Sequence, residues 1–381
     1  MHLLLTALLV AQVIAALVLL VRLEPGRRRK PPVAPCLEHE PATPVTIVVP
    51  TLDEAQRIAP LIDGVLAQGG PVAEIVFVDS GSRDGTLDLL QSAARSDARV
   101  RVERDPPLAD GWIGKAWALQ HGANVARGPW LLGLDADTAP RPGLAAAVVA
   151  AAERYGYDVV SFAPRFAGQR PLERWLQPAM LATLVYRLGP AGDESPPERL
   201  LANGQCFLVR RDVLLAHGGY APVRASFAED VSLARHLARR GARVGFLDGR
   251  LLYDVRSYDS AAQMWREWGR SIDLKDATSR ARQVMDVVFL VLVQGLPLPL
   301  VCAAVATGSP ALRLLLPLNA GLLAVRWLLS LAMAPSYEKR GMAFWLNPLA
   351  DPVAVVRVIV SSLRRPRQWR TRAYTAARAS T

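Results

Sequence analysis

Two aspartates separated by one small residue follow an apolar stretch in the first half of the chain. Residues 130–134 (WLLGL) lead directly into Asp135, Ala136 and Asp137. Apolar runs of this length are typical of buried strands, and in an extended chain alternate side chains point to the same side. Paired carboxylates suit Mg²⁺ or Mn²⁺ held largely through water and a substrate's phosphates. Because a D-x-D pair also occurs in ordinary turns, the surrounding sequence has to decide between a metal site and a turn.

Two further acidic segments directly follow predicted strands. The stretch VPTLDE places Thr51 and Glu54 just beyond the first strand, and VDSGSRDGT places Asp79 and Asp84 beyond the second. A carboxylate such as Asp79 can accept hydrogen bonds from a base or a ribose, and small neighbours let a ligand approach the backbone. Taken singly, each segment is also what a turn requires.

A lysine and a later acidic pair add charges of opposite sign. Lys115 ends the stretch GWIGK near a predicted helix start, a position suited to an anionic ligand. Glu229 and Asp230 open a later predicted helix. Acidic residues there complement the helix dipole, so the pair is either a helix cap or, through Asp230, a general base.

Two helical segments each allow two interpretations. The stretch QMWREW contains Gln263, Arg266 and Trp268. Arginine can bridge phosphates through two hydrogen bonds and tryptophan can stack on a sugar or acceptor, but the same stretch also fits a helix with aromatic packing. Residues 171–188 have apolar residues at helical spacing, so this helix either lies in a membrane interface or packs on the core.

Alternating strand and helix patterns position the acidic segments. The predicted strands cover residues 45–49 (ended by Pro50), 74–78, 99–103 and 130–134, and the predicted helices cover 55–66, 86–95, 115–126 and 143–154. Strands separated by helices predict βαβ units, a mostly parallel sheet and therefore an α/β fold. In such sheets ligands gather at the carboxyl ends of strands, which is where the acidic segments fall.

Long apolar segments predict membrane helices near both ends of the chain. Residues 3–21 are long enough to span a bilayer. A cleaved signal peptide is the alternative, but no charge precedes this run and basic residues 27–30 follow it, which favours an uncleaved anchor with its N-terminus outside. Residues 284–305 and 312–333 predict a hairpin. Residues 344–360 fit a re-entrant or interfacial segment better than a membrane span. A span would place the basic tail outside, against the positive-inside tendency.

Composition agrees with a soluble domain joined to a membrane portion. The chain has 381 residues, of which 51% are hydrophobic, with a net charge of +11 and a mean hydropathy of +0.18. The basic clusters at 27–30 and 364–367 flank apolar segments, so we expect contacts with anionic lipid headgroups and no nucleic-acid partner. Three widely separated cysteines predict neither a disulfide framework nor a zinc site.

In this order, the motifs resemble those of family 2 glycosyltransferases with the GT-A fold, over about residues 44–275. The resemblance rests on VVPTxDE, VDSGSxDGT, GKxxALxxG, DAD, NGQxFLVRR and ED, of which VDSGSxDGT together with DAD is the most specific. It implies a nucleotide-diphosphate sugar donor, for which we expect a UDP-hexose, and a divalent cation, Mg²⁺ or Mn²⁺.

The resemblance also implies roles for individual residues. Asp79 is expected to contact the nucleotide base, Asp137 supported by Asp135 to bring the cation to the diphosphate, and Asp230 to be the catalytic base. Residues 203–211 look like the acceptor-side loop. The remaining expected donor contacts are Thr51, Glu54, Asp84, Lys115, Asp135 (to the donor ribose), Gln263, Arg266 and Trp268.

One departure and the membrane layout narrow the expected acceptor. Processive members carry QxxRW, whereas Trp268 here stands one place later, which puts polymer synthesis in doubt. The N-terminal anchor, the C-terminal hairpin and the tail at 369–374 resemble the subgroup associated with carotenoid and hopanoid pathways. We therefore expect transfer with inversion to a hydroxylated carotenoid or other isoprenoid lipid. The alternatives are a polyprenyl-phosphate enzyme, a ceramide-type enzyme and a non-catalytic membrane scaffold.

These interpretations predict a multi-pass protein of the inner membrane with a cytoplasmic catalytic domain. The predicted segments are an anchor (1–22), a basic, Pro-rich linker (23–44), a GT-A domain (45–282), a membrane hairpin with an interfacial segment (283–363) and a basic tail (364–381).

Overall fold

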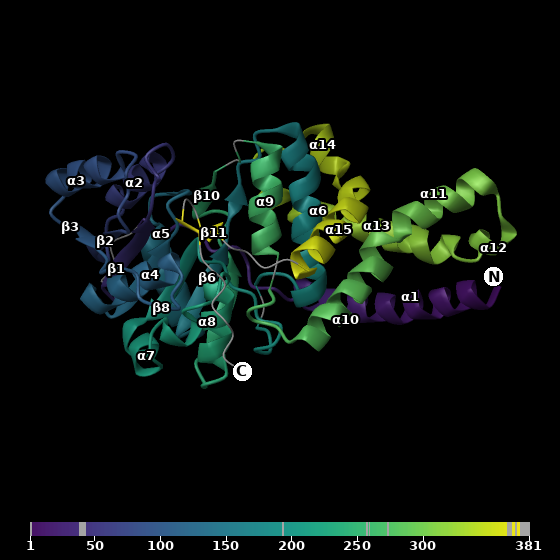
Figure 1. The fold of residues 1–381 in the computed structure, drawn as a ribbon, viewed down its shortest axis with the longest axis horizontal. Helices are drawn as coiled ribbons and strands as arrows, with labels where there is room; N and C mark the ends of the chain where they lie inside the picture. The colour runs from purple at the N-terminus through teal and green to yellow at the C-terminus, as the bar shows by residue number, and fades with distance from the viewer. Residues whose placement is uncertain are drawn as a thin grey trace. The chain divides into compact units, whose positions relative to one another are not determined.

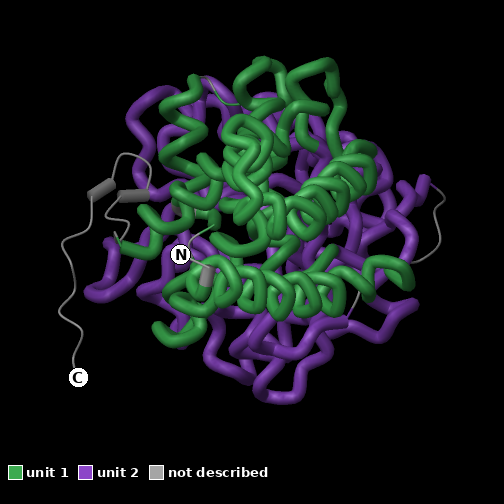
Figure 2. Tube along the Cα trace, turned by 90° about the vertical axis from the view of Figure 1, so that its right-hand side faces the viewer, with its two compact units in different colours: residues 1–29, 166–190, 257–365 green, residues 30–165, 191–256, 366–381 purple. Residues whose placement is uncertain are grey.

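The chain forms two compact units, each built from segments that are distant in sequence. The computed structural model describes residues 2–37, 43–192, 194–256, 258, 260–272, 274–363, 368–369 and 372–373. Unit 1 comprises residues 1–29, 166–190 and 257–365, and unit 2 comprises residues 30–165, 191–256 and 366–381 (Figure 2). The division into anchor, linker, GT-A domain, membrane hairpin and tail stays a prediction. The two units are defined by contacts between residues and not by position in a membrane.

Unit 2 is organised around a seven-stranded sheet in the order β3-β2-β1-β4-β8-β6-β9. The strands are β1 Val45–Thr51, β2 Val72–Asp79, β3 Val100–Arg104, β4 Trp130–Leu134, β6 Val159–Ala163, β8 Cys206–Arg210 and β9 Val244–Asp248. Neighbouring strands are parallel except that β8 runs antiparallel to β4 and β6. The predicted α/β class with a mostly parallel sheet is therefore confirmed.

Helices connect these strands and cover the sheet (Figure 1). They are α2 Ala59–Leu66, α3 Thr86–Ser96, α4 Gly114–Val125, α5 Leu144–Tyr155, α7 Arg211–Ala216 and α8 Glu229–Ala238. The prediction that a helix begins at residue 55 is wrong, because Pro60 lies in the first turn of α2 and Asp53 has a positive φ of 54°. The first strand also continues through Pro50 to Thr51. Its pairing with β4 ends at Val48, and a strand without a neighbour on one side tolerates proline.

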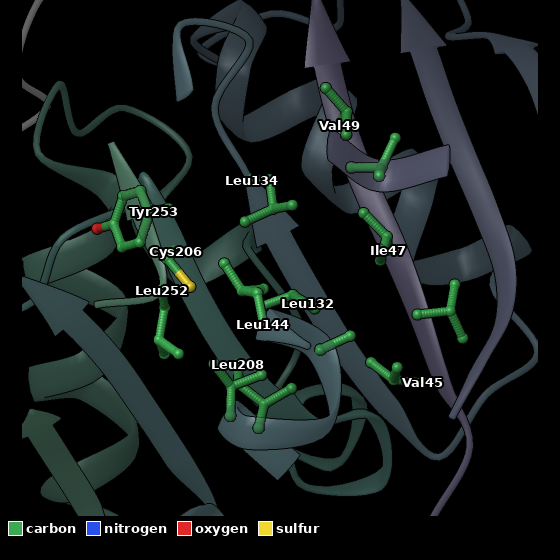
Figure 3. Packing of buried hydrophobic residues seen from close by; sticks show 14 of the residues in the cluster. Val45, Ile47, Val49, Leu132, Leu134, Leu144, Cys206, Leu208, Leu252 and Tyr253 are labelled. Carbon is green, nitrogen blue, oxygen red and sulfur yellow. The ribbon is translucent and has the colours of Figure 1, made fainter. Parts of the chain in front are cut away.

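The core of unit 2 is a layer of apolar side chains from the central strands. Val45, Ile47 and Val49 of β1 pack with alternate residues of β4 and β8 and with Leu144 of α5 (Figure 3). Val45, Ile47, Val49 and Leu144 are 0% exposed. This packing fixes the carboxyl ends of β1 and β4, from which the candidate site is built.

A small second sheet follows the D-A-D segment. It contains β5 Thr138–Pro140, β10 Tyr253–Val255 and β7 Arg165–Phe166, in the order β5-β10-β7. β5 is antiparallel to β10, with Val255 opposite Thr138. The Tyr253 hydroxyl donates to the Phe162 carbonyl oxygen at 2.6 Å, which ties β10 to the end of β6.

Unit 1 is helical. Its helices are α1 His2–Leu23, α6 Pro171–Leu188, α9 Ala261–Ser271, α10 Arg280–Leu290, α11 Pro297–Thr307, α12 Pro310–Arg313, α13 Leu316–Met333, α14 Gly341–Trp345 and α15 Asp351–Leu363. Short 3-10 turns occupy Glu24–Arg27, Ala334–Ser336 and Asn347–Ala350, and a π-helical turn occupies Val291–Gly295.

Among the residues that the structure describes, two segments of unit 1 are long and apolar enough to cross a membrane, namely Leu3–Arg27 and Leu316–Ser336. A third candidate is the pair Arg280–Gly295 and Pro297–Thr307, which is bent by 41°. The bend coincides with the π-helical turn and Pro297, which are common causes of kinks. α11 and α13 lie side by side (Figure 1). The predicted segment 284–305 is divided among α10, the π-helical turn and α11, and a membrane hairpin stays a prediction.

The helix α6 packs inside unit 1. Leu176, Met180, Leu184 and Leu188 are buried, and the Arg187 guanidinium donates to the Ile272 carbonyl oxygen at 2.9 Å. Residues 171–188 therefore form a helix that packs against its neighbours, which is one of the two interpretations of this segment.

Polar side chains of the apolar helices pair in the interior of unit 1. Arg326 of α13 forms a buried ion pair with Asp351 at 2.9 Å, and Gln12 of α1 donates to Asn319 of α13 at 2.9 Å.

Near the C-terminus, in unit 2, β11 Gln368–Trp369 pairs with β12 Arg372–Ala373 in an antiparallel ladder. The basic cluster at 364–367 and the rest of the tail motif lie outside the described residues.

Candidate active site

The acidic segments of unit 2 lie at the carboxyl ends of neighbouring parallel strands. Thr51 of β1 stands opposite Asp79 of β2, and the backbone N–H of Ser80 donates to the Thr51 carbonyl oxygen at 3.0 Å. The Thr51 hydroxyl donates to the Val78 carbonyl oxygen at 3.2 Å. Both predicted donor residues are thus buried at one edge of the sheet, as the strand pattern implies.

Asp79 closes a tight turn at the end of β2. Its carboxylate accepts hydrogen bonds from the backbone N–H of Gly81 and of Ser82, each at 3.1 Å, and from the Ser82 hydroxyl at 2.5 Å. Gly81 has a φ of 89°, a conformation in which glycine avoids the strain of a Cβ. These hydrogen bonds fix the Asp79 carboxylate at the end of β2, and its contact with the nucleotide base stays a prediction.

Asp84 and Glu54 hold the loop after β1 against the start of α3. The Asp84 carboxylate accepts from the Ala55 N–H at 2.9 Å and from the Thr86 N–H at 3.1 Å. Burial raises the pKa of Asp84, but the hydrogen bonds from Thr86 and Ala55 outweigh this effect and hold it below its ordinary value. Glu54 is buried and accepts from the Arg57 guanidinium at 2.5 Å. These contacts organise the loop, and a direct donor contact by either residue stays a prediction.

The D-A-D segment links β4 to β5. Ala136 is buried while Asp135 and Asp137 are partly exposed, which fits the predicted alternation. The Asp135 carbonyl oxygen accepts from the Thr138 hydroxyl at 2.8 Å, and the Asp137 carbonyl oxygen accepts from the Arg256 N–H at 3.2 Å. Hydrogen bonds to backbone carbonyl oxygens therefore hold both ends of this segment.

Lys115, the second residue of α4, bridges two carboxylates. Its ammonium lies 2.8 Å from the Asp135 carboxylate and 2.8 Å from the Glu229 carboxylate. Burial alone would lower the pKa of Lys115, but Asp135, Glu229 and Asp230 together raise it. Lys115 is therefore a fixed positive charge beside the D-A-D segment.

Asp230 joins the first turn of α8 to the predicted acceptor-side loop. One carboxylate oxygen accepts from the Gly204 N–H at 2.7 Å, and the other accepts from the Val231 N–H at 2.8 Å. Burial and the neighbouring Glu229 raise the pKa of Asp230 to about 7, against the opposing effect of Lys115. A carboxylate with a pKa near neutrality is suited to general-base catalysis.

The structure brings Lys115, Asp135, Glu229 and Asp230 into one cluster, whereas the QMWREW residues belong to unit 1. Gln263, Arg266 and Trp268 lie on α9. Trp268 is buried, with its ring centroid 6.3 Å from that of Phe166, so aromatic packing accounts for it. Donor contacts by these three residues stay a prediction.

The sequence gives little indication of two features of the site, the Glu229–Lys115 ion pair and the position of Arg256. Glu229 belongs to the E-D pair, but its partner Lys115 is distant along the chain. Arg256 belongs to no motif, and its guanidinium donates to the Gln56 carbonyl oxygen at 3.2 Å while its backbone binds Asp137. Arg256 thus connects the loop after β1 with the D-A-D segment, a link that depends on the pairing of β10 with β5.

The carboxylates fit a cation that is shared with a substrate. Within the described part of the chain, no group of three or more His, Cys, Asp or Glu side chains is arranged to hold a metal ion. Mg²⁺ and Mn²⁺ accept one or two carboxylates and take their other ligands from water and phosphate oxygens. Asp137 and Asp135 are suited to this mode of binding and not to a closed protein cage.

Comparisons with known proteins show similarity to glycosyltransferases over part of the chain. Residues 46–218 match the family described as Glycosyl transferase family 2. Over 115 residues the chain is 35% identical to the succinoglycan biosynthesis protein ExoO of Rhizobium meliloti, covering 30% of this chain and 31% of that protein. Over 147 residues it is 33% identical to the undecaprenyl-phosphate 4-deoxy-4-formamido-L-arabinose transferase of Pseudomonas fluorescens, covering 38% of this chain and 41% of that protein. The chain thus matches less than half of the length of these relatives.

A solved structure extends the similarity of fold. The mannosyltransferase PcManGT from Pyrobaculum calidifontis, in complex with GDP-Man and Mn²⁺, aligns with a TM-score of 0.54 and 20% identity. The alignment covers 94% of this chain and 99% of that chain. The comparisons thus give a match of residues 46–218 to a glycosyltransferase family and, for the chain, the GT-A fold.

Proposed function

We propose that the protein is a membrane-associated, inverting glycosyltransferase that moves a hexose from a nucleotide-diphosphate sugar to a lipid hydroxyl. The observation that carries this proposal is the Asp230 carboxylate, bound to the Gly204 N–H at 2.7 Å beside the Lys115–Asp135 pair. A base placed next to a diphosphate-binding segment has a use when the acceptor is a neutral hydroxyl that must lose its proton.

The proposed reaction is a single displacement. The acceptor oxygen bonds to the anomeric carbon of the sugar while the bond from that carbon to the diphosphate oxygen breaks, which inverts the configuration. The proton of the acceptor hydroxyl passes to Asp230, and the nucleoside diphosphate departs with the bonding electrons. A positioned base of this kind contributes roughly 10²–10⁴ in rate.

The donor is proposed to lie across the carboxyl ends of β1, β2 and β4. Asp79 and Thr51 would hold the nucleotide, a UDP in our proposal, while Asp137 and Asp135 would hold Mg²⁺ or Mn²⁺ against its diphosphate. A bound divalent cation supplies charge stabilisation of the departing diphosphate. Lys115 places a further positive charge beside Asp135.

The acceptor is proposed to be a hydroxylated carotenoid or another isoprenoid lipid. This choice rests on the base and on the resemblance of the membrane layout to carotenoid- and hopanoid-associated enzymes. The second candidate is a polyprenyl phosphate, which is favoured by the name of the undecaprenyl-phosphate transferase relative. A phosphate acceptor is already anionic and needs no base, so the two candidates differ in their need for Asp230.

We further propose an inner-membrane location with the catalytic unit in the cytoplasm and contacts to anionic headgroups. α15 has 13 residues, which corresponds to about 20 Å of helix and is shorter than a hydrocarbon core of about 30 Å. Met342 of α14 and Val356 of α15 expose 74% and 53% of their surface. An interfacial position for α14 and α15 fits both observations.

The acceptor class is tested by incubating the full chain in lipid nanodiscs with labelled UDP-hexose, Mn²⁺ and either a hydroxylated carotenoid or undecaprenyl phosphate. The proposal predicts a labelled carotenoid glycoside with inverted anomeric configuration. Label on undecaprenyl phosphate alone would assign the second candidate, and label on neither would contradict both.

A further inference from the structure

Glu229 is a buried carboxylate between the donor side and the acceptor side of the site. Its side chain is 7% exposed and lies 2.8 Å from the Lys115 ammonium. The same ammonium lies 2.8 Å from Asp135, which follows β4. An ionised carboxylate buried to this extent requires a partner, and Lys115 is the one that the geometry gives it.

The base is the immediate neighbour of Glu229 but has different partners. The Asp230 carboxylate accepts from the backbone N–H of Gly204 and of Val231. A Cβ at Gly204 would lie 3.0 Å from the Lys115 ammonium and 3.5 Å from an Asp230 oxygen. The lysine head, the acceptor-side loop and the base therefore meet at a position where glycine leaves room for all three.

We propose that Glu229 is a positioning residue for the transfer reaction, which rests on the function proposed above. By sharing the Lys115 ammonium with Asp135, Glu229 keeps that cation from forming an ion pair with Asp230. The Asp230 carboxylate then stays available to an acceptor hydroxyl.

The charges around Asp230 give Glu229 a second effect in the same direction. Asp230 is faced by Glu229 on α8, Lys115 on α4 and the buried phenol of Tyr220, and Asp135 after β4 faces Lys115 and Tyr220. Glu229 raises the proton affinity of Asp230, and Lys115 lowers it. With Glu229→Gln, the like charge disappears and Lys115 loses one of its two carboxylate partners. Both changes make Asp230 a weaker base.

The first test is the pH dependence of kcat/KM for the full chain in nanodiscs. We expect the acidic limb of the wild-type profile near pH 7 and a displacement by about one pH unit or more to lower pH in Glu229→Gln, the size typical of a neighbouring charge. Binding of UDP in the presence of Mn²⁺, measured by calorimetry, should change by about twofold or less. A reduced kcat with an unmoved acidic limb would overturn the proposal and leave Glu229 a structural role.

Glu74→Gln is the matched control. Glu74 is also buried and ion-paired, with Arg101, but it lies near the amino end of β2. We expect it to lower stability without moving the acidic limb. An equal displacement in this variant would show that the effect is not specific to the site.

A second measurement does not depend on the acceptor. The unfolding temperature of the wild type is compared with that of Asp230→Asn over a range of pH, and Glu229→Gln is compared with the double variant in the same way. The pH at which each difference changes reports the titration of Asp230 in that background. A midpoint that moves to lower pH in Glu229→Gln supports the proposal, and an unchanged midpoint overturns it. Because this readout needs no transfer, a wrong acceptor assignment leaves the test of Glu229 intact.

Discussion

Lys115 forms ion pairs with carboxylates from two separate parts of the chain. These ion pairs place one positive charge between two negative charges in the site. Asp135 belongs to the segment after β4, and Glu229 opens α8. One ammonium therefore joins the proposed cation-binding segment to the helix that carries the proposed base. Asp137, two residues from Asp135, remains the proposed direct ligand of the cation.

Asp137→Ala should remove metal-dependent donor binding. Loss of a cation ligand is expected to weaken UDP binding in Mn²⁺ by about 100-fold or more, since loss of residues that merely support metal ligands already costs 10–100-fold. Titration calorimetry with and without Mn²⁺ measures this change. Asp88→Ala, at an exposed position of α3, is the control and should bind as the wild type does. Unchanged donor affinity in Asp137→Ala would show that the cation site lies elsewhere.

Asp230 should make stability depend on pH with a defined sign. Its pKa in the folded chain is about 7, above the ordinary value of 3.8. The folded state therefore holds the proton more tightly, and the stability contributed by Asp230 is full below pH 4 and is lost as the pH rises through 7. Asp230→Asn should consequently unfold at a higher temperature than the wild type at pH 8, with a smaller difference at pH 5. A wild type that gains stability relative to Asp230→Asn between pH 5 and pH 8 would contradict the raised pKa.

At the scale of elements, close packing of α2 against β5 supports the D-A-D segment. A Cβ added at Gly64 of α2 would lie 2.5 Å from the Pro140 carbonyl oxygen of β5, which is backbone and cannot move alone. We expect Gly64→Ala to lower the free energy of unfolding by about 1–3 kcal/mol and to weaken donor binding through a shift of β5. Denaturant unfolding and UDP calorimetry measure the two effects.

Gly321→Ala is the control for that variant. Gly321 lies in α13, with nothing within 4 Å of the added Cβ, so alanine should be neutral or should stabilise the helix by up to about 1 kcal/mol. If Gly64→Ala behaves as Gly321→Ala does, the packing of α2 does not constrain β5.

Much of this element structure is predictable from local sequence. The apolar runs at 45–49, 74–78 and 130–134 are strands, and the acidic groups follow them. The start of α2 is not predictable from apolar spacing alone, because the backbone N–H groups of residues 53–55 donate to the side chains of Ser82, Thr86 and Asp84 and so stay outside the helix. The Lys115–Glu229 pair is not predictable either, because the sheet topology brings α4 and α8 together and no local pattern encodes that contact.

At the scale of the whole molecule, unit 1 combines long apolar helices with buried polar pairs. α1 and α13 are joined by the Gln12–Asn319 hydrogen bonds, and Arg326 is neutralised by Asp351. Polar groups that are satisfied within a helical bundle are compatible with a hydrocarbon environment.

The protein should therefore remain with the membrane under conditions that release peripheral proteins. We expect the full chain to sediment with membranes after extraction at pH 11 and to enter solution with detergent. Release of the chain at pH 11 without detergent would show that the apolar helices do not span the bilayer.

The central claim is that Asp230 removes the proton from a hydroxyl acceptor. The most direct measurement compares the rate of hexose transfer by the wild type and by Asp230→Asn in nanodiscs, with UDP affinity measured on the same samples. We predict that the rate to the hydroxylated isoprenoid acceptor falls by roughly 10²–10⁴ while UDP binding in Mn²⁺ is kept within about twofold. A correctly folded Asp230→Asn protein that transfers hexose at a rate close to that of the wild type would contradict the claim.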